Sequence, residues 1–329
     1  MIRLSIIIPF YGVEPFIRQC LSSVFDQDIP EDEYEVICVN DCSLDQSEKI
    51  VLEYQSLHHN LILIRHEVNK RLGASRNTGL SHAKGRYVWF VDSDDYIKEN
   101  CLAELLGICE KNRLDILHWS IQDNQGKWIK QLSNSRVING INEIKDSWGS
   151  PLFDITFPWN RLYSREFLLS NHLWFNDLWG GDVIHTILAL NAAKRLVNSS
   201  SCFYIYRVDN FNSDMRSPLN AHKVYAFIIA LGKAVRECGQ NDVSNEISSI
   251  ISECGVWRLN QCPKVLMRLP LSEKKVFFRI IQKHPEEKKY AIQFADMKVK
   301  LVLLFPGLVY FMHPFYRIAS IIKHRLHPR

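Results

Sequence analysis

The first 118 residues alternate between short apolar runs and longer segments of helical periodicity, and this alternation constrains the fold more than any other feature. The apolar runs are rich in branched aliphatic residues, which is typical of strands that are covered on both faces. Strands in regular alternation with helices predict an α/β fold with a mostly parallel sheet and helices on both faces. The expected strands are Leu4–Pro9, Glu35–Asn40, Leu61–Arg65, Arg86–Val91 and Leu114–Trp119.

Helical segments are expected between these strands. Pro15 opens the first helix, and the third and fourth are expected over Leu72–Ala83 and Glu99–Lys111. Ser43 and Gln46 have the spacing of a capping box, in which each side chain bonds the backbone N–H of the other residue. The second helix is therefore expected to begin directly after Ser43.

The pattern changes further along the chain, and this predicts three parts. Residues 1–118 alternate strand and helix, residues 119–216 are less regular, and residues 217–329 are mainly helical. The charge is also uneven, since residues 1–263 carry 26 Lys and Arg against 32 Asp and Glu, whereas residues 264–329 carry 14 against 4. A strongly basic end favours an anionic partner, either a membrane surface or nucleic acid.

The basic tail is interpreted as a peripheral membrane contact through residues 298–325. Its apolar part is too short and too interrupted by prolines to span a bilayer, but it can lie in the interface with the basic residues facing lipid phosphates. The alternative is a C-terminal helix that packs on the rest of the chain. Nucleic acid is not expected, because the basic residues are mixed with aliphatic ones and no nucleic-acid-binding module is recognisable. The nine cysteines form no CxxC pair and favour a reducing location, so a cytoplasmic position at the inner face of the cell membrane is expected.

The acidic run Asp92-Ser93-Asp94-Asp95 directly follows the fourth predicted strand. Three carboxylates within four residues repel one another unless a cation lies between them. Hard divalent ions such as Mg²⁺ and Mn²⁺ prefer oxygen ligands, so the run predicts a metal site. The alternative is a solvated acidic turn that caps the next helix.

Three polar residues follow three different predicted strands. Tyr11, Asp41 and Asp92 each come just after a strand ends. Ligands of open α/β sheets bind outside the carboxyl ends of the strands. These residues are therefore expected to lie close together at one edge of the sheet.

Four blocks occur in an order that resembles family 2 glycosyltransferases of the GT-A fold. They are LSIIIPFYGVE, EVICVNDCSLD, NKRLGASRNTGLSHAKG and YVWFVDSDD, within the first hundred residues. The resemblance implies a Rossmann-like GT-A domain, in which residues 1–118 are the nucleotide-sugar-binding half and 119–216 the acceptor-binding half. The fourth block corresponds to the DxD motif of that family.

The resemblance also implies roles for individual residues. Pro9, Phe10 and Tyr11 would line the nucleotide base pocket, with Tyr11 stacked on the base. Asp94 would be the direct ligand of Mn²⁺ or Mg²⁺, and Asp92 would contact either the ribose or the metal. The other donor-binding residues implied are Glu14 at the ribose or base edge, Asp41 at the base, Arg76 beside the diphosphate, and Ser93 within the motif. The alternatives are strand-end packing for Pro9 to Tyr11, a turn for Asp41 and a surface helix position for Arg76.

The catalytic base implied by the resemblance is Asp182. Family members commonly carry an acidic pair at this place, but this chain has Gly181-Asp182, with Asp177 as the fallback. A base is required because the acceptor hydroxyl must lose a proton. Asp182 could alternatively only cap the helix that follows it.

The expected function is an inverting, metal-dependent transfer of a sugar from a nucleotide-diphosphate sugar, with a UDP-sugar favoured, to a glycan or lipid-linked acceptor. Two alternatives remain. A nucleotidyltransferase usually needs a Gly-rich basic loop near its N-terminus, which Pro9–Glu14 lacks. A non-catalytic nucleotide-sugar-binding protein would bind the donor without transfer. A Rossmann dehydrogenase is disfavoured, since no GxGxxG motif follows the first strand.

Overall fold

The computed structural model describes residues 1–140, 142–143, 157–176, 181–210, 226, 229, 266, 268–286 and 288–289. The chain divides into two compact units, the first comprising Met1–Asp177 with Gly181–Arg216 and the second Leu178–Gly180 with Ser217–Arg329. Within the second unit, helix α11 (Leu271–Ile281) is described, and Phe277, Phe278 and Ile281 are its buried apolar residues. The division at residues 118 and 216 stays a prediction, and the tail 298–325 lies outside the described residues.

The N-terminal half of the sheet is parallel, as the alternating pattern predicts. Its strand order is β3 (Leu61–Arg65), β2 (Tyr34–Asn40), β1 (Leu4–Phe10) and β4 (Tyr87–Phe90). Each neighbouring pair runs in the same direction, with Ile7 opposite both Ile37 and Phe90. The carboxyl ends of these strands therefore meet at one edge of the sheet.

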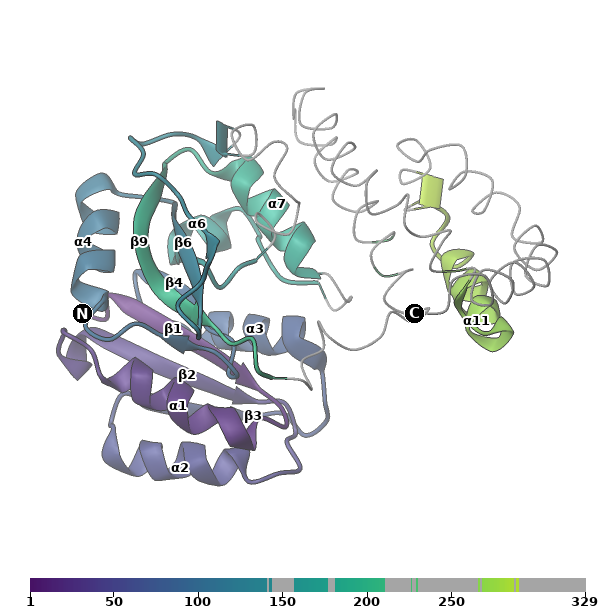
Figure 1. Ribbon diagram of the computed structural model, residues 1–329, viewed down its shortest axis with the longest axis horizontal. Helices are drawn as coiled ribbons and strands as arrows, with labels where there is room; N and C mark the ends of the chain where they lie inside the picture. The colour runs from purple at the N-terminus through teal and green to yellow at the C-terminus, as the bar shows by residue number, and fades with distance from the viewer. Residues whose placement is uncertain are drawn as a thin grey trace, which may run out of the picture. The chain divides into compact units, whose positions relative to one another are not determined.

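The second half of the sheet differs from the prediction because it introduces antiparallel strands (Figure 1). Strand β8 (Arg161–Ser164) lies between β4 and β6 (Ile116–Asp123) and runs antiparallel to both. The predicted fifth strand is thus β6, which is not a neighbour of β4. Strand β9 (Leu196–Tyr206) runs parallel to β6. It also pairs antiparallel with the two-residue strand β5 (Tyr96–Ile97). The short strand β7 (Trp128–Lys130) pairs antiparallel with β6 as a hairpin.

Helices cover both faces of the sheet. On one face, α1 (Glu14–Phe25), α2 (Ser47–Leu57) and α4 (Leu102–Asn112) contribute buried residues to the same core cluster as alternate residues of β1, and α1 and α2 lie side by side in Figure 1. On the other face, α3 (Arg71–His82) lies against β1, because a Cβ added at Gly79 would come within 2.2 Å of Cγ2 of Ile7. Only glycine permits this close approach. The contact between Gly79 and Ile7 fixes the position of α3, the helix that carries Arg76, on the sheet. The remaining described helices of the first unit are η1 (Glu31–Glu33), α6 (Arg165–Ser170) and α7 (Gly181–Ala192).

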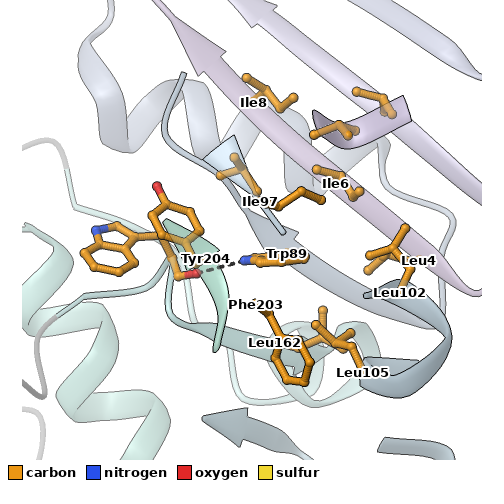
Figure 2. Packing of buried hydrophobic residues seen from close by; sticks show 14 of the residues in the cluster. Leu4, Ile6, Ile8, Trp89, Ile97, Leu102, Leu105, Leu162, Phe203 and Tyr204 are labelled. Atoms are coloured by element: carbon orange, nitrogen blue, oxygen red, sulfur yellow. Dashed lines mark hydrogen bonds between the residues drawn. The ribbon is translucent and has the colours of Figure 1, made fainter. Parts of the chain in front are cut away.

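The core on the α1 face is aromatic and aliphatic (Figure 2). The rings of Trp89 and Trp119, both fully buried, meet edge to face with their centroids 5.0 Å apart. The Trp89 indole N–H donates to the carbonyl of Trp159 at 2.8 Å, so the buried polar group is satisfied. Because Trp89 lies two residues before Val91 and three before Asp92, this packing supports the strand end that carries the acidic run.

The predicted capping box is wrong. Helix α2 begins at Ser47, its N-cap is Gln46, and that cap makes no side-chain hydrogen bond. The capping acceptor is instead Asp45, whose Oδ1 accepts from the Ser47 N–H at 3.1 Å and whose Oδ2 accepts from the Glu14 N–H at 2.9 Å. The loop after β2 is longer than the Ser43–Gln46 spacing predicts. As a result, the carboxylate of Asp45, one residue before the N-cap, accepts from backbone N–H groups at the starts of both α1 and α2.

Candidate active site

The turn Asp92–Asp95 follows β4 and is closed by the Asp95 N–H, which donates to the Asp92 carbonyl at 3.0 Å. The Asp95 side chain is buried and accepts two hydrogen bonds, from the Tyr204 hydroxyl at 2.5 Å and from the Arg207 N–H at 2.7 Å. Burial, followed by the neighbouring carboxylates of Asp94 and Asp92, raises the pKa of Asp95 well above its ordinary value. Asp95 therefore anchors the acidic turn to β9 and does not face a ligand.

Asp94 is held by two residues that follow β9, Arg207 and Asn210. Its Oδ2 accepts from the Asn210 side-chain amide at 2.8 Å, and its carbonyl accepts from Arg207 Nε at 2.6 Å. Within the described part of the chain, no hydrogen bond reaches Oδ1 of Asp94. Burial, followed by repulsion from Asp92, raises the pKa of Asp94. This carboxylate is therefore oriented through one oxygen, and its other oxygen has no hydrogen-bond donor among the described residues.

Arg76 joins the acidic turn to the candidate base. Its side chain is 0% exposed and donates from Nη2 to Asp92 Oδ1 at 2.6 Å and from Nη1 to Asp182 Oδ1 at 2.5 Å. Burial alone would lower the pKa of Arg76, but the carboxylates of Asp182 and Asp92 raise it. The guanidinium also lies 5.1 Å from the centroid of the Phe175 ring. One buried cation thus brings together two carboxylates from distant parts of the sequence.

The segment before α7 places Asp182 at this point. The Asn77 amide donates to the Phe175 carbonyl at 2.9 Å, and its Oδ1 accepts from the Phe175 N–H at 2.8 Å. A Cβ at Gly181 would come within 2.3 Å of the Asn176 carbonyl oxygen, so this close turn accommodates only glycine. The glycine that replaces the expected acidic partner is therefore explained by packing.

The Asp182 carboxylate is suited to accept a proton. Its side chain is 31% exposed, so a ligand can reach it. Burial of the rest of the group, together with the charge of Asp92, raises its pKa, while Arg76 lowers it, and the net direction is upward. A carboxylate with a raised pKa is a better base than an ordinary one.

The three residues predicted for the base pocket differ in exposure. Tyr11 is 51% exposed, whereas Phe10 is 2% exposed and belongs to the core that α1 covers. Pro9 is also buried within β1. Of these three, only Tyr11 presents an aromatic ring to solvent at the carboxyl edge of the sheet.

Asp41 lies at the same edge and holds the loop between β3 and α3. Its Oδ1 accepts from His66 Nδ1 and from the Lys70 N–H, both at 2.8 Å, and its Oδ2 accepts from the Arg71 N–H at 2.7 Å. Arg71 has φ of 74°, a strained backbone angle for a residue with a side chain. The carboxylate therefore stabilises the start of α3, and its contact with a base stays a prediction.

The other predicted site residues are also placed. Glu14 is exposed, and its Oε2 accepts from the Gln46 N–H at 3.1 Å, which links the starts of α1 and α2. Ser93 is buried within the acidic turn. Asp177, the fallback base, lies outside the described residues.

Two residues at the site were not predicted. The Tyr204 hydroxyl donates to Asp95 and accepts from the Asp92 N–H at 3.3 Å, and Asn210 orients Asp94. These roles could not be assigned from sequence, because both contacts depend on β9 and the residues after it lying beside the acidic turn. Trp159 stacks on the Tyr204 ring with a centroid distance of 4.5 Å, and both residues belong to the buried core.

The donor set fits a hard divalent cation. The structure holds Asp92 and Asp94 on one turn, and among the described residues Asp92 Oδ2 and Asp94 Oδ1 accept no hydrogen bond. No group of three or more His, Cys, Asp or Glu side chains converges to hold a metal in that described part. A site with two protein carboxylates is nevertheless usual for Mg²⁺, whose other ligands are then substrate phosphates and water.

Comparison with known proteins identifies the family. Residues 5–170 match the sequence profile of Glycosyl transferase family 2. The chain belongs to this family. It is 32% identical over 209 residues to a poly(ribitol-phosphate) beta-glucosyltransferase of Bacillus spizizenii, a match that covers 63% of this chain and 32% of that protein. It is 33% identical over 218 residues to the uncharacterized glycosyltransferase EpsJ of Bacillus subtilis, covering 64% of this chain and 62% of EpsJ. The matched region thus spans less than two thirds of either relative.

Solved structures confirm the predicted GT-A fold. The chain superposes on S. aureus TarS in complex with UDP-GlcNAc with a TM-score of 0.72 and 22% identity, covering 97% of this chain and 92% of the other. The mannosyltransferase PcManGT from Pyrobaculum calidifontis, in complex with GDP-Man and Mn²⁺, matches with a TM-score of 0.55 and 14% identity over 92% and 87% of the two chains. Across the described residues, no helix of this family member has the length and apolar character needed to cross a membrane.

Proposed function

We propose that this protein transfers a sugar from a UDP-sugar to a glycan or lipid-linked acceptor, in an inverting reaction that depends on Mn²⁺ or Mg²⁺. The observation that carries the proposal is the Arg76 bridge, which brings Asp92 of the acidic turn and Asp182 of α7 into one site. Family membership supports glycosyl transfer. A UDP-sugar is favoured because the similar TarS structures contain UDP and UDP-GlcNAc.

The donor would lie across the carboxyl edge of the parallel half of the sheet. Tyr11 offers an exposed ring for stacking on the base, and Asp41 lies at the end of the neighbouring strand. Asp94 and Asp92 would hold the divalent cation. When bound, that cation would neutralise charge on the departing diphosphate.

The acceptor hydroxyl would react in a single displacement. Its oxygen forms a bond to the anomeric carbon, the bond from that carbon to the diphosphate oxygen breaks, and the electron pair leaves with UDP. The hydroxyl proton moves to Asp182. In the described part of the chain Oδ1 of Asp182 accepts from Arg76 and Oδ2 accepts no hydrogen bond, so Oδ2 is the oxygen that can receive the proton. One displacement at one carbon inverts its configuration.

Arg76 has a supporting role in this scheme. The prediction from sequence placed it beside the diphosphate, whereas the structure holds its guanidinium buried against two carboxylates. In this position it keeps Asp182 ionised and correctly oriented before the acceptor arrives. Contact with the diphosphate stays a prediction, as do the peripheral membrane contact through 298–325 and the position at the inner face of the membrane.

The experiment uses the full chain with UDP-GlcNAc or UDP-glucose, MnCl₂ and a panel of glycan acceptors, and measures UDP release and glycosylated product. Asp182→Asn is expected to keep donor binding and lose transfer by at least about a hundredfold, because the base is lost. Asp94→Asn is expected to lose metal-assisted donor binding as well. Asp32→Asn, whose side chain is 88% exposed and remote from the acidic turn in sequence, serves as the matched control.

Near-normal turnover in Asp182→Asn or Asp94→Asn would refute the role of that residue. Donor binding by the unmodified protein with no transfer to any acceptor would instead support a non-catalytic nucleotide-sugar-binding protein. Appearance of labelled nucleotide in the product would point to nucleotidyl transfer.

A further inference from the structure

A groove lies beside the acidic turn. It has a volume of about 640 Å³ and is formed by α1, by β5 with the residues after it, and by the hairpin of β6 and β7. Tyr96 lines the groove and follows Asp95 directly, so its Cα lies at most about 7.6 Å from that of Asp94. None of the roles proposed above for the donor, the metal or the base uses this groove.

The charge of the groove does not suit a phosphate ligand. Among the described residues that line it, three carry carboxylates, Asp26, Asp123 and Glu99, and one, Lys98, carries a positive charge. An anionic ligand would meet net repulsion here. The groove therefore fits an uncharged ligand that brings its own hydrogen-bonding groups.

Several polar side chains in the groove are available to such a ligand. In the described part of the protein, the amides of Gln122 and Asn100 and the carboxylates of Asp26 and Glu99 make no side-chain hydrogen bond. Amides both donate and accept, and carboxylates accept, which suits hydroxyl groups that do both. Asp123 differs, because its Oδ1 already accepts from the N–H groups of Gln125 and Lys127 in the hairpin.

A partly exposed tryptophan that does not itself line the groove lies opposite one of the lining residues. Trp128 is 39% exposed and lies directly opposite Gln122 in the antiparallel pair of β6 and β7. Side chains of directly opposed residues project from the same face of a sheet. A flat apolar ring beside amides and carboxylates is complementary to a sugar ring, which has an apolar face and hydroxyl groups at its edge.

The groove is also connected to the acidic turn. Gln19 lines it and accepts, through Oε1, a hydrogen bond from Arg207 Nη2. Arg207 in turn donates from Nε to the Asp94 carbonyl and lies over the Tyr96 ring at 5.5 Å. A ligand that runs from the acidic turn along Tyr96 would enter this groove.

We propose that the groove is a second carbohydrate site, which binds neutral sugar residues of the acceptor at a distance from the reacting hydroxyl. That the bound glycan is an acceptor rests on the proposed function, but the binding of a neutral glycan to the groove does not. Sugar hydroxyls would bond the free amides and carboxylates, and one ring would stack on Trp128.

The test is a saturation-transfer NMR titration of the full chain with chitohexaose, cellohexaose and maltohexaose, in the absence of donor and metal. At least one of them is expected to bind. Trp128→Ala and Gln122→Ala are each expected to weaken that binding about tenfold, since one stacking contact or one hydrogen-bonded group is lost. Trp174→Ala removes a tryptophan of similar exposure, 42%, that neither lines the groove nor pairs with a residue that lines it, and is expected to leave the affinity unchanged. Thermal unfolding of each variant verifies that it is folded.

Asp94→Asn separates this proposal from the proposed function, because it is expected to abolish transfer and to leave glycan binding intact. Three results would each overturn the proposal. They are no binding by any of the three hexasaccharides, unchanged affinity in both groove variants, and loss of binding in Trp174→Ala alone.

Discussion

Replacing Arg76 with methionine removes the only cation that the described structure places between the acidic turn and Asp182. Methionine keeps an unbranched side chain of similar length over the Phe175 ring, so the change deletes mainly the charge and the two hydrogen bonds. Asp92 and Asp182 are then left facing each other without a partner.

The expected loss of stability follows from the burial of the three groups. Breaking a fully buried ion pair costs about 3–5 kcal/mol, whereas a fully exposed pair contributes about 0–1 kcal/mol. The Arg76 side chain is 0% exposed, but those of Asp92 and Asp182 are 24% and 31% exposed, so water relieves part of the loss. We expect the free energy of unfolding to fall by about 2–3 kcal/mol at pH 7. Transfer is expected to fall at least about a hundredfold, because Asp182 loses its fixed orientation.

The assay is urea denaturation of the full chain followed by tryptophan fluorescence, together with UDP release under saturating donor. Arg86→Met is the matched control, since Arg86 is exposed and its contact with the Tyr87 ring at 5.6 Å is expected to contribute at most about 1 kcal/mol. If Arg76→Met were as stable as Arg86→Met, the bridge would contribute nothing and the reasoning would be refuted. A stable variant with normal transfer would also remove Arg76 from the mechanism.

Three further predictions concern the acidic turn, the buried histidines and the tail. Tyr204→Phe removes one of the two donors to the buried Asp95 carboxylate and is expected to cost about 1.5–3 kcal/mol of unfolding free energy, measured in urea; no loss would contradict the anchoring role. Burial lowers the pKa of His118 to about 4 and that of His185 to about 3. The unfolded chain therefore binds protons that the folded one does not. Stability should fall as pH drops from about 6.5 towards 4, by up to about 1.4 kcal/mol per pH unit for each histidine. His185→Phe should reduce the dependence of unfolding free energy on pH, measured by urea denaturation at several pH values. An unchanged dependence would contradict the role assigned to buried His185. The full chain should sediment with phosphatidylglycerol vesicles more than with phosphatidylcholine vesicles, and neutralising the basic residues of 298–325 should abolish the difference; equal sedimentation would exclude the electrostatic contact.

The N-terminal part of the fold was predictable because its signal is local. The strand Leu61–Arg65 agrees with the prediction at both ends, and the predicted helix Leu72–Ala83 differs from the observed Arg71–His82 by one residue. Buried parallel strands require continuous apolar runs, and such runs are visible in sequence. The start of α2 was missed because Asp45 takes the capping role that Ser43 was expected to have.

The second half of the sheet was not predictable in the same way. Strand β8 has only four residues, and its insertion between β4 and β6 depends on contacts between segments far apart in sequence. The same limit applies at the site. That Asp92 lies at the carboxyl edge of the parallel strands follows from the strand that precedes it. Its hydrogen bond with Arg76, and that of Arg76 with Asp182, depend on how α3 and α7 pack on the sheet.

The most direct test of the account is calorimetric titration of the full chain with UDP, with and without MnCl₂. If the carboxylates of Asp92 and Asp94 hold a cation against the diphosphate, Mn²⁺ should tighten UDP binding at least about tenfold, and Asp94→Asn should abolish that gain. Equal affinity with and without Mn²⁺ in the unmodified protein would contradict the proposed metal-dependent donor site.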